Sequence, residues 1–505
     1  MRYTQESPAE GPPLVRERIC ILALLVAVGI FHAATVRQGH IWSDDFAMYV
    51  HHAQNIVEGR PYIDTGYIYN PSFPVYGPKF YPPIFPVLLA PVYRSFGLNL
   101  IPMKLEQVLF LVLALIAVYA YWRRDLGPGY TLALVALLGF NPEFWLAKDN
   151  VLSDIPFLFF FYLTALLVRS ARRDGSGWWR WSAWLWPAMI GVVIYLAIGT
   201  RAVGIALLAG LLFYDVVRLR TITRFTAVSV AVCAVFLVLQ PRIMGFGPDG
   251  YGYQRPTLHT IAANIAAYAR VLASFWVGSA PHVFAYAVLG LFSAFALGGL
   301  VIQSRRGFTF VETALAAYFA IILLWPFPAG VRMVFPVVPW IGYLALSGCK
   351  GLTEKMGLRY AAAAASVLFL LIAVGYVQFY RGVSFGPIRQ TTGLPEFNQV
   401  CDAVRANTAP EDAILYFRAR ALSLYTGRPA SSYNYRGRDA ELWRWAEHIQ
   451  AKYVVTTNAF DEDGGFLLRF VQNNAPNFEF VYENPHFKLY RIRSFSATSP
   501  DLLVR

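Results

Sequence analysis

The residues of this chain that are able to do acid–base or phosphate chemistry lie beside long apolar runs. Two adjacent carboxylates, Asp44 and Asp45, follow the first run; Asp149 comes just before the fourth run and Asp154 begins it. A charged group beside a membrane span is costly unless it reaches water or has a function. Cations accompany these carboxylates on the same side of the expected spans: Lys79, Arg201, Arg255, Arg270 and Arg332. Such a mixture suits the handling of an anionic group at the lipid–water boundary.

The elements that must position these residues are membrane spans. A helix needs about 20 apolar residues to cross a bilayer, because every backbone polar group must be satisfied internally. Of the 505 residues, 57% are hydrophobic and only 14% are charged, whereas a soluble protein usually has about 25% charged residues. We expect eleven spans, at residues 19–36, 100–122, 128–148, 154–170, 181–199, 201–218, 225–243, 282–303, 307–327, 331–349 and 358–379.

Basic residues orient these spans. They occur in every second connection, for example Arg123 and Arg124 after the second run and Arg218, Arg220 and Arg224 after the sixth. By the positive-inside rule these connections face the cytoplasm, which places the N-terminus inside and the C-terminus outside. The Arg-, Ala- and Leu-rich composition is compatible with a bacterial plasma (inner) membrane. The net charge of +13 therefore reflects the topology, and we expect no nucleic-acid partner.

Three outer segments are long, namely residues 37–99, residues 244–281 and the tail from about residue 381. In the first, residues 37–99, apolar residues recur at helical spacing after Asp45, and Gly59 can end that helix. We expect it to lie on the outer interface of the membrane. The tail from residue 381 is much more polar and alternates strand-like and helical patterns. The fold expected is an all-α polytopic membrane protein over residues 1–380, with a small extracytoplasmic α/β domain over 381–505.

Four pieces of sequence occur in an order that resembles a known group of enzymes. They are the acidic pair Asp44-Asp45, the segment Lys79-Phe-Tyr-Pro-Pro, L-S-D-I-P-F with Asp154, and Arg332-Met-Val-Phe-Pro-Val-Val-Pro. In this order the chain resembles the lipid-dependent membrane glycosyltransferases of the C-type superfamily. These include the protein O-mannosyltransferases and the lipid A aminoarabinose transferases. The resemblance covers about the first 350 residues and leaves the tail unmatched.

The resemblance implies an inverting transfer of a sugar from a polyprenyl-phosphate donor to a lipid, glycan or protein acceptor on the outer face. A hydroxyl acceptor needs a carboxylate to take its proton, and the departing phosphate needs cations or a divalent metal ion. By resemblance the base is Asp45 or Asp44, with Asp45 preferred, because the pair is Asp-Asp where Asp-Glu is common. Asp154 would position the acceptor or bind the metal. Arg332, Arg201 and Lys79 would hold the donor phosphate.

Other interpretations remain open at this point. A transporter or flippase of lipid-linked sugars would place polar residues near mid-span and often shows paired halves, neither of which is evident here. An assembly subunit without catalytic activity is a third possibility. Individual residues also have simpler explanations, since acidic residues favour the first turn of a helix and arginines at span ends reach lipid headgroups.

Overall fold

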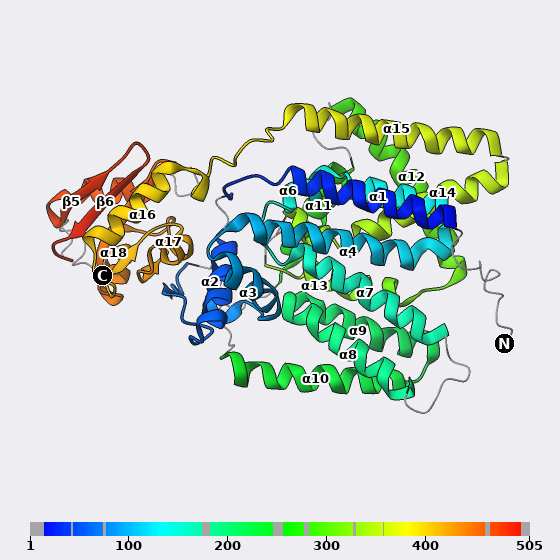
Figure 1. Cartoon of the computed structure of the whole chain (residues 1–505), viewed down its shortest axis with the longest axis horizontal. Coiled ribbons are helices and arrows are strands. Elements are labelled where there is room, and N and C mark those ends of the chain that lie inside the picture. The colour runs from blue at the N-terminus through cyan, green and yellow to red at the C-terminus, as the bar shows by residue number, and fades with distance from the viewer. Residues whose placement is uncertain are drawn as a thin grey trace.

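The structure is a computed structural model, and most of its residues lie in helices. Figure 1 shows the long helices side by side with roughly parallel axes, and the strands gathered at one end of them. Between the bundle and the strands lie two shorter helices, α2 (Asp45–Glu58) and α3 (Ile84–Phe96). The structure describes residues 15–41, 44–73, 77–173, 182–245, 256–276, 282–326, 330–356, 358–459 and 465–495.

The helices of the bundle occupy the apolar runs. They are α1 (Val15–Ala34), α4 (Leu100–Leu126), α5 (Pro128–Gly139), α6 (Pro142–Ala147), α7 (Asp154–Arg173), α8 (Ser182–Thr200), α9 (Ile205–Tyr214), α10 (Arg224–Met244), α11 (Leu258–Phe275), α12 (His282–Arg306), α13 (Phe310–Leu323), α14 (Val338–Met356) and α15 (Leu358–Gly382).

Length and composition support a multi-pass membrane protein. Within the described ranges, six helical segments are long and apolar enough to cross a membrane, and several shorter helices are also apolar. The expected count of eleven spans therefore stays a prediction. One expected run, 128–148, is broken because Asn141 caps a new helix by accepting a hydrogen bond from the Glu143 N–H, and Pro142 occupies its first position. The six segments are Val15–Ala34, Leu100–Leu126, Asp154–Ala171, Ala202–Leu219, Arg224–Arg242 and Tyr286–Arg306.

A mixed sheet stands at the end of the bundle. Its strands are β1 (Tyr67–Ile68), β2 (Ala413–Leu415), β3 (Ala430–Ser431), β4 (Ala451–Thr457), β5 (Phe478–Glu483) and β6 (Phe487–Ile492), in the order β1-β3-β2-β4-β6-β5. Pairing from β1 to β4 is parallel, and β6 pairs antiparallel with both β4 and β5. Because β1 belongs to the segment of residues 37–99, the sheet joins that segment to the tail.

Helices cover both faces of the sheet. Successive strand residues point to opposite faces, so Val455 packs with α16 (Pro395–Asn407) and α17 (Ala419–Thr426), whereas Val454 packs with α18 (Asp439–His448) and α19 (Phe466–Asn473). The first of these two clusters also contains the apolar residues of α2. The tail is thereby held against the segment of residues 37–99 through a shared core.

The position of α2 differs from the expected one. The helix begins at Asp45 and ends at Gly59 as its sequence indicates, but most of its residues are buried. It packs between α3 and α17, so protein covers more of its surface than an exposed interfacial helix would bury. The reason is that the buried residues, including His51 and His52, cover more than one face of the helix. The first residue of α2 is consequently fixed between the bundle and the tail.

The short segment before α2 is fixed from several sides. The Lys104 side chain of α4 donates to the Arg37 carbonyl at 2.7 Å, and Arg37 in turn pairs with Asp149 at 2.7 Å. The Ile388 N–H donates to the Gln38 carbonyl at 2.8 Å. At Gly39, which has a φ of +79°, an added Cβ would lie only 2.2 Å from the Ile388 carbonyl oxygen, so a side chain does not fit. These contacts set where the acidic pair can lie.

Candidate active site

Four of the expected site residues meet where the ends of several helices converge. Asp45 is the first residue of α2 and Asp154 the first of α7. Arg201 follows α8 directly, and Arg332 lies in the short turn η4 (Gly330–Val334) that precedes α14. Segments far apart in the sequence are therefore brought together at one end of the bundle.

Arg332 joins two of these carboxylates. Its Nη1 donates to Asp45 Oδ2 at 3.0 Å and its Nε to Asp154 Oδ2 at 2.9 Å. Arg201 donates to the other oxygen of Asp154. The Arg332 side chain keeps 32% of its surface exposed, so the cluster is accessible from outside although most of its groups are buried.

A third arginine, Arg420, reaches the cluster from α17. Its Nη1 donates to Asp45 Oδ1 at 3.2 Å and also to the hydroxyl of Tyr81. Its Nε donates to Asp44 Oδ2 at 3.3 Å. Nothing in the sequence singled out Arg420, because the tail contains many arginines and its sequence shows no recognisable motif. Only the fold shows that the tail supplies a cation to the acidic pair.

Tyr81 is the other residue that the sequence analysis did not single out. It lies within the Lys79-Phe-Tyr-Pro-Pro segment, and its hydroxyl donates to Asp45 Oδ1 at 2.8 Å. Its carbonyl accepts a hydrogen bond from the Tyr62 hydroxyl at 2.9 Å. Burial raises the pKa of Tyr81 well above its usual range, so the phenol stays protonated and acts as a donor. Its place in the motif was the signal that could have identified it.

The two adjacent carboxylates have different surroundings. Asp44 is only 4% exposed and accepts from the backbone N–H groups of Arg420 and Ala421 at 3.3 and 3.1 Å, at the start of α17. Asp45 is 24% exposed. Asp44 therefore holds the tail to the bundle, whereas Asp45 remains partly open to a ligand.

The charge state of Asp45 follows from its neighbours. Burial would raise the pKa of this carboxyl, but the guanidinium groups of Arg332 and Arg420 and the Tyr81 hydroxyl outweigh it. The pKa of Asp45 is held well below its usual range, so the carboxylate is ionised near neutral pH. The Asp45 carboxylate becomes a better proton acceptor when a ligand neutralises part of the positive charge of these arginines.

The remaining expected residues lie apart from the cluster. Lys79 is half-buried in η1 (Pro78–Phe80), two residues before Tyr81, and makes no ion pair with another described residue. Asp149 forms ion pairs with Arg37 and Lys148. Arg270 is exposed on α11 and donates only to a backbone carbonyl of its own helix, as far as the described residues show. Arg255 lies outside the described residues.

The carboxylates as arranged do not fit a metal ion. Both oxygens of Asp154 accept from arginines, as do both oxygens of Asp45, and Asp44 is bound by Arg420 and two backbone N–H groups. The described ranges contain no cluster of three or more His, Cys, Asp or Glu side chains with metal-binding geometry. Guanidinium groups at this distance repel a divalent cation, so we assign no metal to Asp154.

The fold, in contrast to the sequence, has clear relatives. The sequence matches no model of a known protein family and none of the curated proteins. The structure is similar to that of ArnT from Cupriavidus metallidurans bound to undecaprenyl phosphate, with a TM-score of 0.60 and 15% identity over 96% of this chain and 100% of that one. The membrane-protein neighbour and the apolar helices of this chain both indicate a multi-pass membrane protein.

A second group of neighbours is archaeal. The oligosaccharyltransferase AglB from Archaeoglobus fulgidus, in complex with an inhibitory peptide and a dolichol-phosphate, gives a TM-score of 0.55 and 13% identity. That match covers 88% of this chain and 70% of AglB. The oligosaccharyltransferase from the same organism in complex with Zn and sulfate gives a TM-score of 0.56 and 14% identity, over 86% and 68% of the two chains. The expected structural resemblance to the C-type superfamily is therefore confirmed.

Proposed function

We propose that this protein is an inverting glycosyltransferase that moves a sugar from a polyprenyl-phosphate donor to an acceptor on the outer face of the membrane. The observation that carries the proposal is the Arg332 guanidinium, which holds the carboxylates of α2 and α7 at one partly exposed place. A base and a phosphate-binding cation are what such a transfer requires. The neighbours that bind undecaprenyl phosphate and dolichol-phosphate have this fold.

In the proposed reaction, the acceptor hydroxyl attacks the anomeric carbon as Asp45 takes the hydroxyl proton. The bond between that carbon and the phosphate oxygen breaks, and the lipid phosphate leaves with the bonding electrons. The phosphate is a stable anion that needs no proton, so one carboxylate suffices. This differs from hydrolytic glycosidases, which pair two carboxylates. Asp44 is too fully engaged to share the role, because it is bound by Arg420 and by the start of α17.

Donor binding would also make Asp45 a better base. Arg332 is shared between Asp45 and Asp154, and a phosphate that binds Arg332 adds negative charge beside Asp45. A nearby negative charge raises the pKa of a carboxyl group. The pKa of Asp45, low without ligand, would then rise toward a value suited to proton transfer. Coupling of this kind keeps the base inactive until the donor is in place.

The other cations have separate roles in this proposal. Arg201 holds Asp154, which in turn orients Arg332 through the Nε bond. Lys79 has no carboxylate partner among the described residues, so it is free to pair with the donor phosphate. Transport is not favoured as a second function, because the charged residues of the cluster lie at the ends of helices, whereas a transporter places such residues near mid-span.

The proposal is tested with purified protein in detergent, given labelled undecaprenyl-phosphate sugars and a mixture of membrane-lipid and peptide acceptors. The wild-type protein should release undecaprenyl phosphate and label one acceptor class. Asp45→Asn should lower the rate of release about 10²–10⁴-fold, whereas the control Asp402→Asn should not, since Asp402 is an exposed residue that pairs with Arg405. Full activity of Asp45→Asn would exclude Asp45 as the base.

A further inference from the structure

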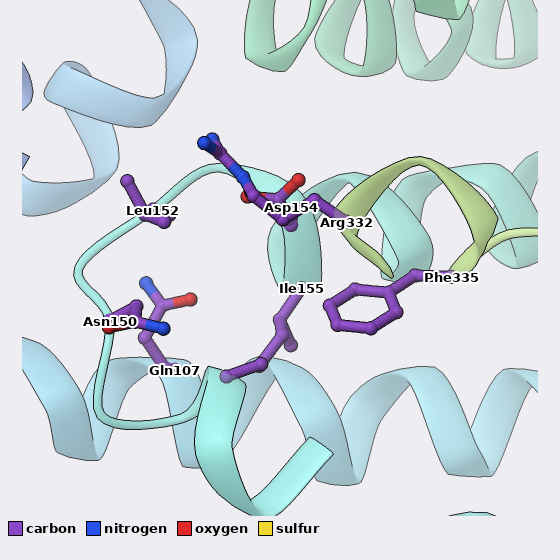
Figure 2. Close-up of a pocket in the computed structure, with 8 residues that line it drawn as sticks. Gln107, Asn150, Leu152, Asp154, Ile155, Arg332 and Phe335 are labelled. Carbon is purple, nitrogen blue, oxygen red and sulfur yellow. The ribbon is translucent and has the colours of Figure 1, made fainter. Parts of the chain in front are cut away.

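A small recess opens beside Asp154 and Arg332, and two polar residues of its lining, Gln107 and Asn150, have no role in the reaction described above. Figure 2 shows Gln107 of α4 and Asn150, which lies before α7, projecting toward it from one side. Asp154, Ile155, Arg332 and Phe335 form the other side. The recess has room for one group of about the size of a water molecule or a hydroxyl.

Gln107 is the unusual member of this lining. Its side chain is completely buried, and neither the amide nitrogen nor the amide oxygen has a hydrogen-bond partner among the described residues. The side-chain oxygen of Asn150 is also buried and has no such partner within that part of the chain. Buried polar groups are nearly always hydrogen-bonded, and leaving one unsatisfied costs stability. The Asn150 amide nitrogen donates to the Leu146 carbonyl at 3.4 Å, so only its oxygen is unpaired among the described residues. Together with the fully unpaired Gln107 amide at the same recess, this oxygen indicates a polar ligand.

The position of Gln107 is set by helix packing. Phe110, about one turn further along α4, contacts Phe159 and Phe160 of α7. The helix on which Gln107 lies is therefore packed against the helix that begins with Asp154. Lys104, one turn earlier on α4, anchors the segment before the acidic pair. A change in the Gln107 side chain can thus be made without removing the contacts that place the helix.

The lining defines the chemistry of the ligand. An amide both donates and accepts hydrogen bonds and carries no charge. A cation is disfavoured because Arg332 lines the recess, and an anion is disfavoured by the carboxylate of Asp154. A hydroxyl group is small and neutral, and it can accept from the Gln107 amide nitrogen while it donates to an amide oxygen.

We propose that Gln107, together with Asn150, binds one hydroxyl group of the donor sugar. This inference rests on the proposed function. The recess adjoins Arg332, which is proposed to hold the phosphate, and in the donor that phosphate is bonded directly to the sugar. An ordered water molecule has the same chemistry, and the experiment below separates the two sources.

The test compares lipids with and without the sugar. Binding of undecaprenyl phosphate, undecaprenyl-phosphate mannose and undecaprenyl-phosphate glucose is measured for wild type and for Gln107→Met, which keeps the length of the side chain but loses its hydrogen bonds. Loss of one such bond should weaken binding of the preferred sugar lipid about tenfold, while the affinity for undecaprenyl phosphate stays unchanged. The thermal unfolding temperature of the variant should not fall, because an unsatisfied amide has been removed.

A matched control and a second ligand series complete the test. Gln240→Met replaces another buried glutamine whose amide oxygen has no partner in the described structure, on α10 away from the recess, and it should change neither affinity. Deoxy analogues of the preferred sugar should identify one hydroxyl whose removal makes wild type and Gln107→Met equal.

Equal affinities of wild type and Gln107→Met for every sugar lipid would assign the recess to water and overturn the inference, while the proposed transfer would still stand. Equal weakening for undecaprenyl phosphate and the sugar lipids would overturn it as well. A wild-type protein that binds none of the lipids would instead overturn the proposed function.

Discussion

Arg332 donates one hydrogen bond to Asp45 and another to Asp154, so a single guanidinium ties the first residue of α2 to the first residue of α7. Buried or partly buried ion pairs are weak evidence for stability, because desolvation offsets much of the attraction. An arrangement in which the shared cation is also the most exposed of the three groups is better explained by ligand binding.

Substitution of the two adjacent carboxylates should have different effects, one on stability and the other on the transfer rate. Asp44→Asn removes the charge that Arg420 and the start of α17 depend on. We expect it to lower the free energy of unfolding by about 3 kcal/mol, seen as a lower thermal midpoint in detergent. Asp45→Asn should keep the midpoint and lower the transfer rate by about 10²–10⁴-fold. The reverse pattern would contradict the assignment of Asp45 as the base.

Arg420 should control the pH dependence of the reaction. Its guanidinium is one of the groups that hold the pKa of Asp45 below the usual range. Without that charge the carboxyl binds its proton more tightly, so the pKa rises. Arg420→Met should therefore move the acid limb of the rate profile to higher pH than in wild type. The measurement is the rate of undecaprenyl phosphate release from pH 4 to 9.

A second substitution of Arg420 distinguishes a role in the reaction from a role in folding. Arg420→Lys restores a positive charge without the forked geometry of the guanidinium, and it should move the acid limb part of the way back. Arg428→Met serves as the control, because Arg428 contacts only backbone oxygens and Thr408 in the described structure. An acid limb that stays at the wild-type pH in Arg420→Met would show that Arg420 does not act on Asp45.

Removal of divalent cations should leave the rate unchanged. Each carboxylate of the cluster is already matched by arginine or backbone N–H groups, so the phosphate charge is stabilised by cationic side chains. We expect dialysis against EDTA to have no effect on transfer. Loss of activity that Mg²⁺, Mn²⁺ or Zn²⁺ restores would return Asp154 to the role of a metal ligand that its sequence context first suggested.

The sidedness of the chain can be tested without any substrate. The expected topology places the tail outside and the connection between α9 and α10 in the cytoplasm. A cysteine introduced by Arg438→Cys, at a position that is 86% exposed in the native protein, should react with a membrane-impermeant maleimide in intact cells. One introduced by Arg224→Cys, at the start of α10, should react only after the cells are opened. Labelling of both in intact cells would contradict the topology.

The sequence predicted the site best where chemistry and local structure agree. Asp45 and Asp154 each begin a helix, and both positions were recognisable from the neighbouring residues. Arg332 was recognisable from the prolines that follow it. Arg420 could not be predicted, because its contact with Asp45 depends on how the tail packs against α2 through a common core. Tyr81 lay inside a recognised motif but was overlooked in favour of Lys79.

The same distinction holds for the fold. Apolar runs mark helices reliably because the bilayer requires internal backbone hydrogen bonding. They do not reveal that 128–148 breaks at Asn141, where a side-chain cap starts a new helix. Strand β1 has only two residues, Tyr67 and Ile68, and is recognisable only by its pairing with β3. The placement of α2 also depended on partners distant in sequence.

If Arg332 binds the phosphate of the donor beside the base Asp45, a structure of the protein with undecaprenyl phosphate should show it. We expect the phosphate within hydrogen-bond distance of Arg332 and Lys79, beside the Asp45 carboxylate. A phosphate bound at another place, with Arg332 still paired to both Asp45 and Asp154, would contradict it.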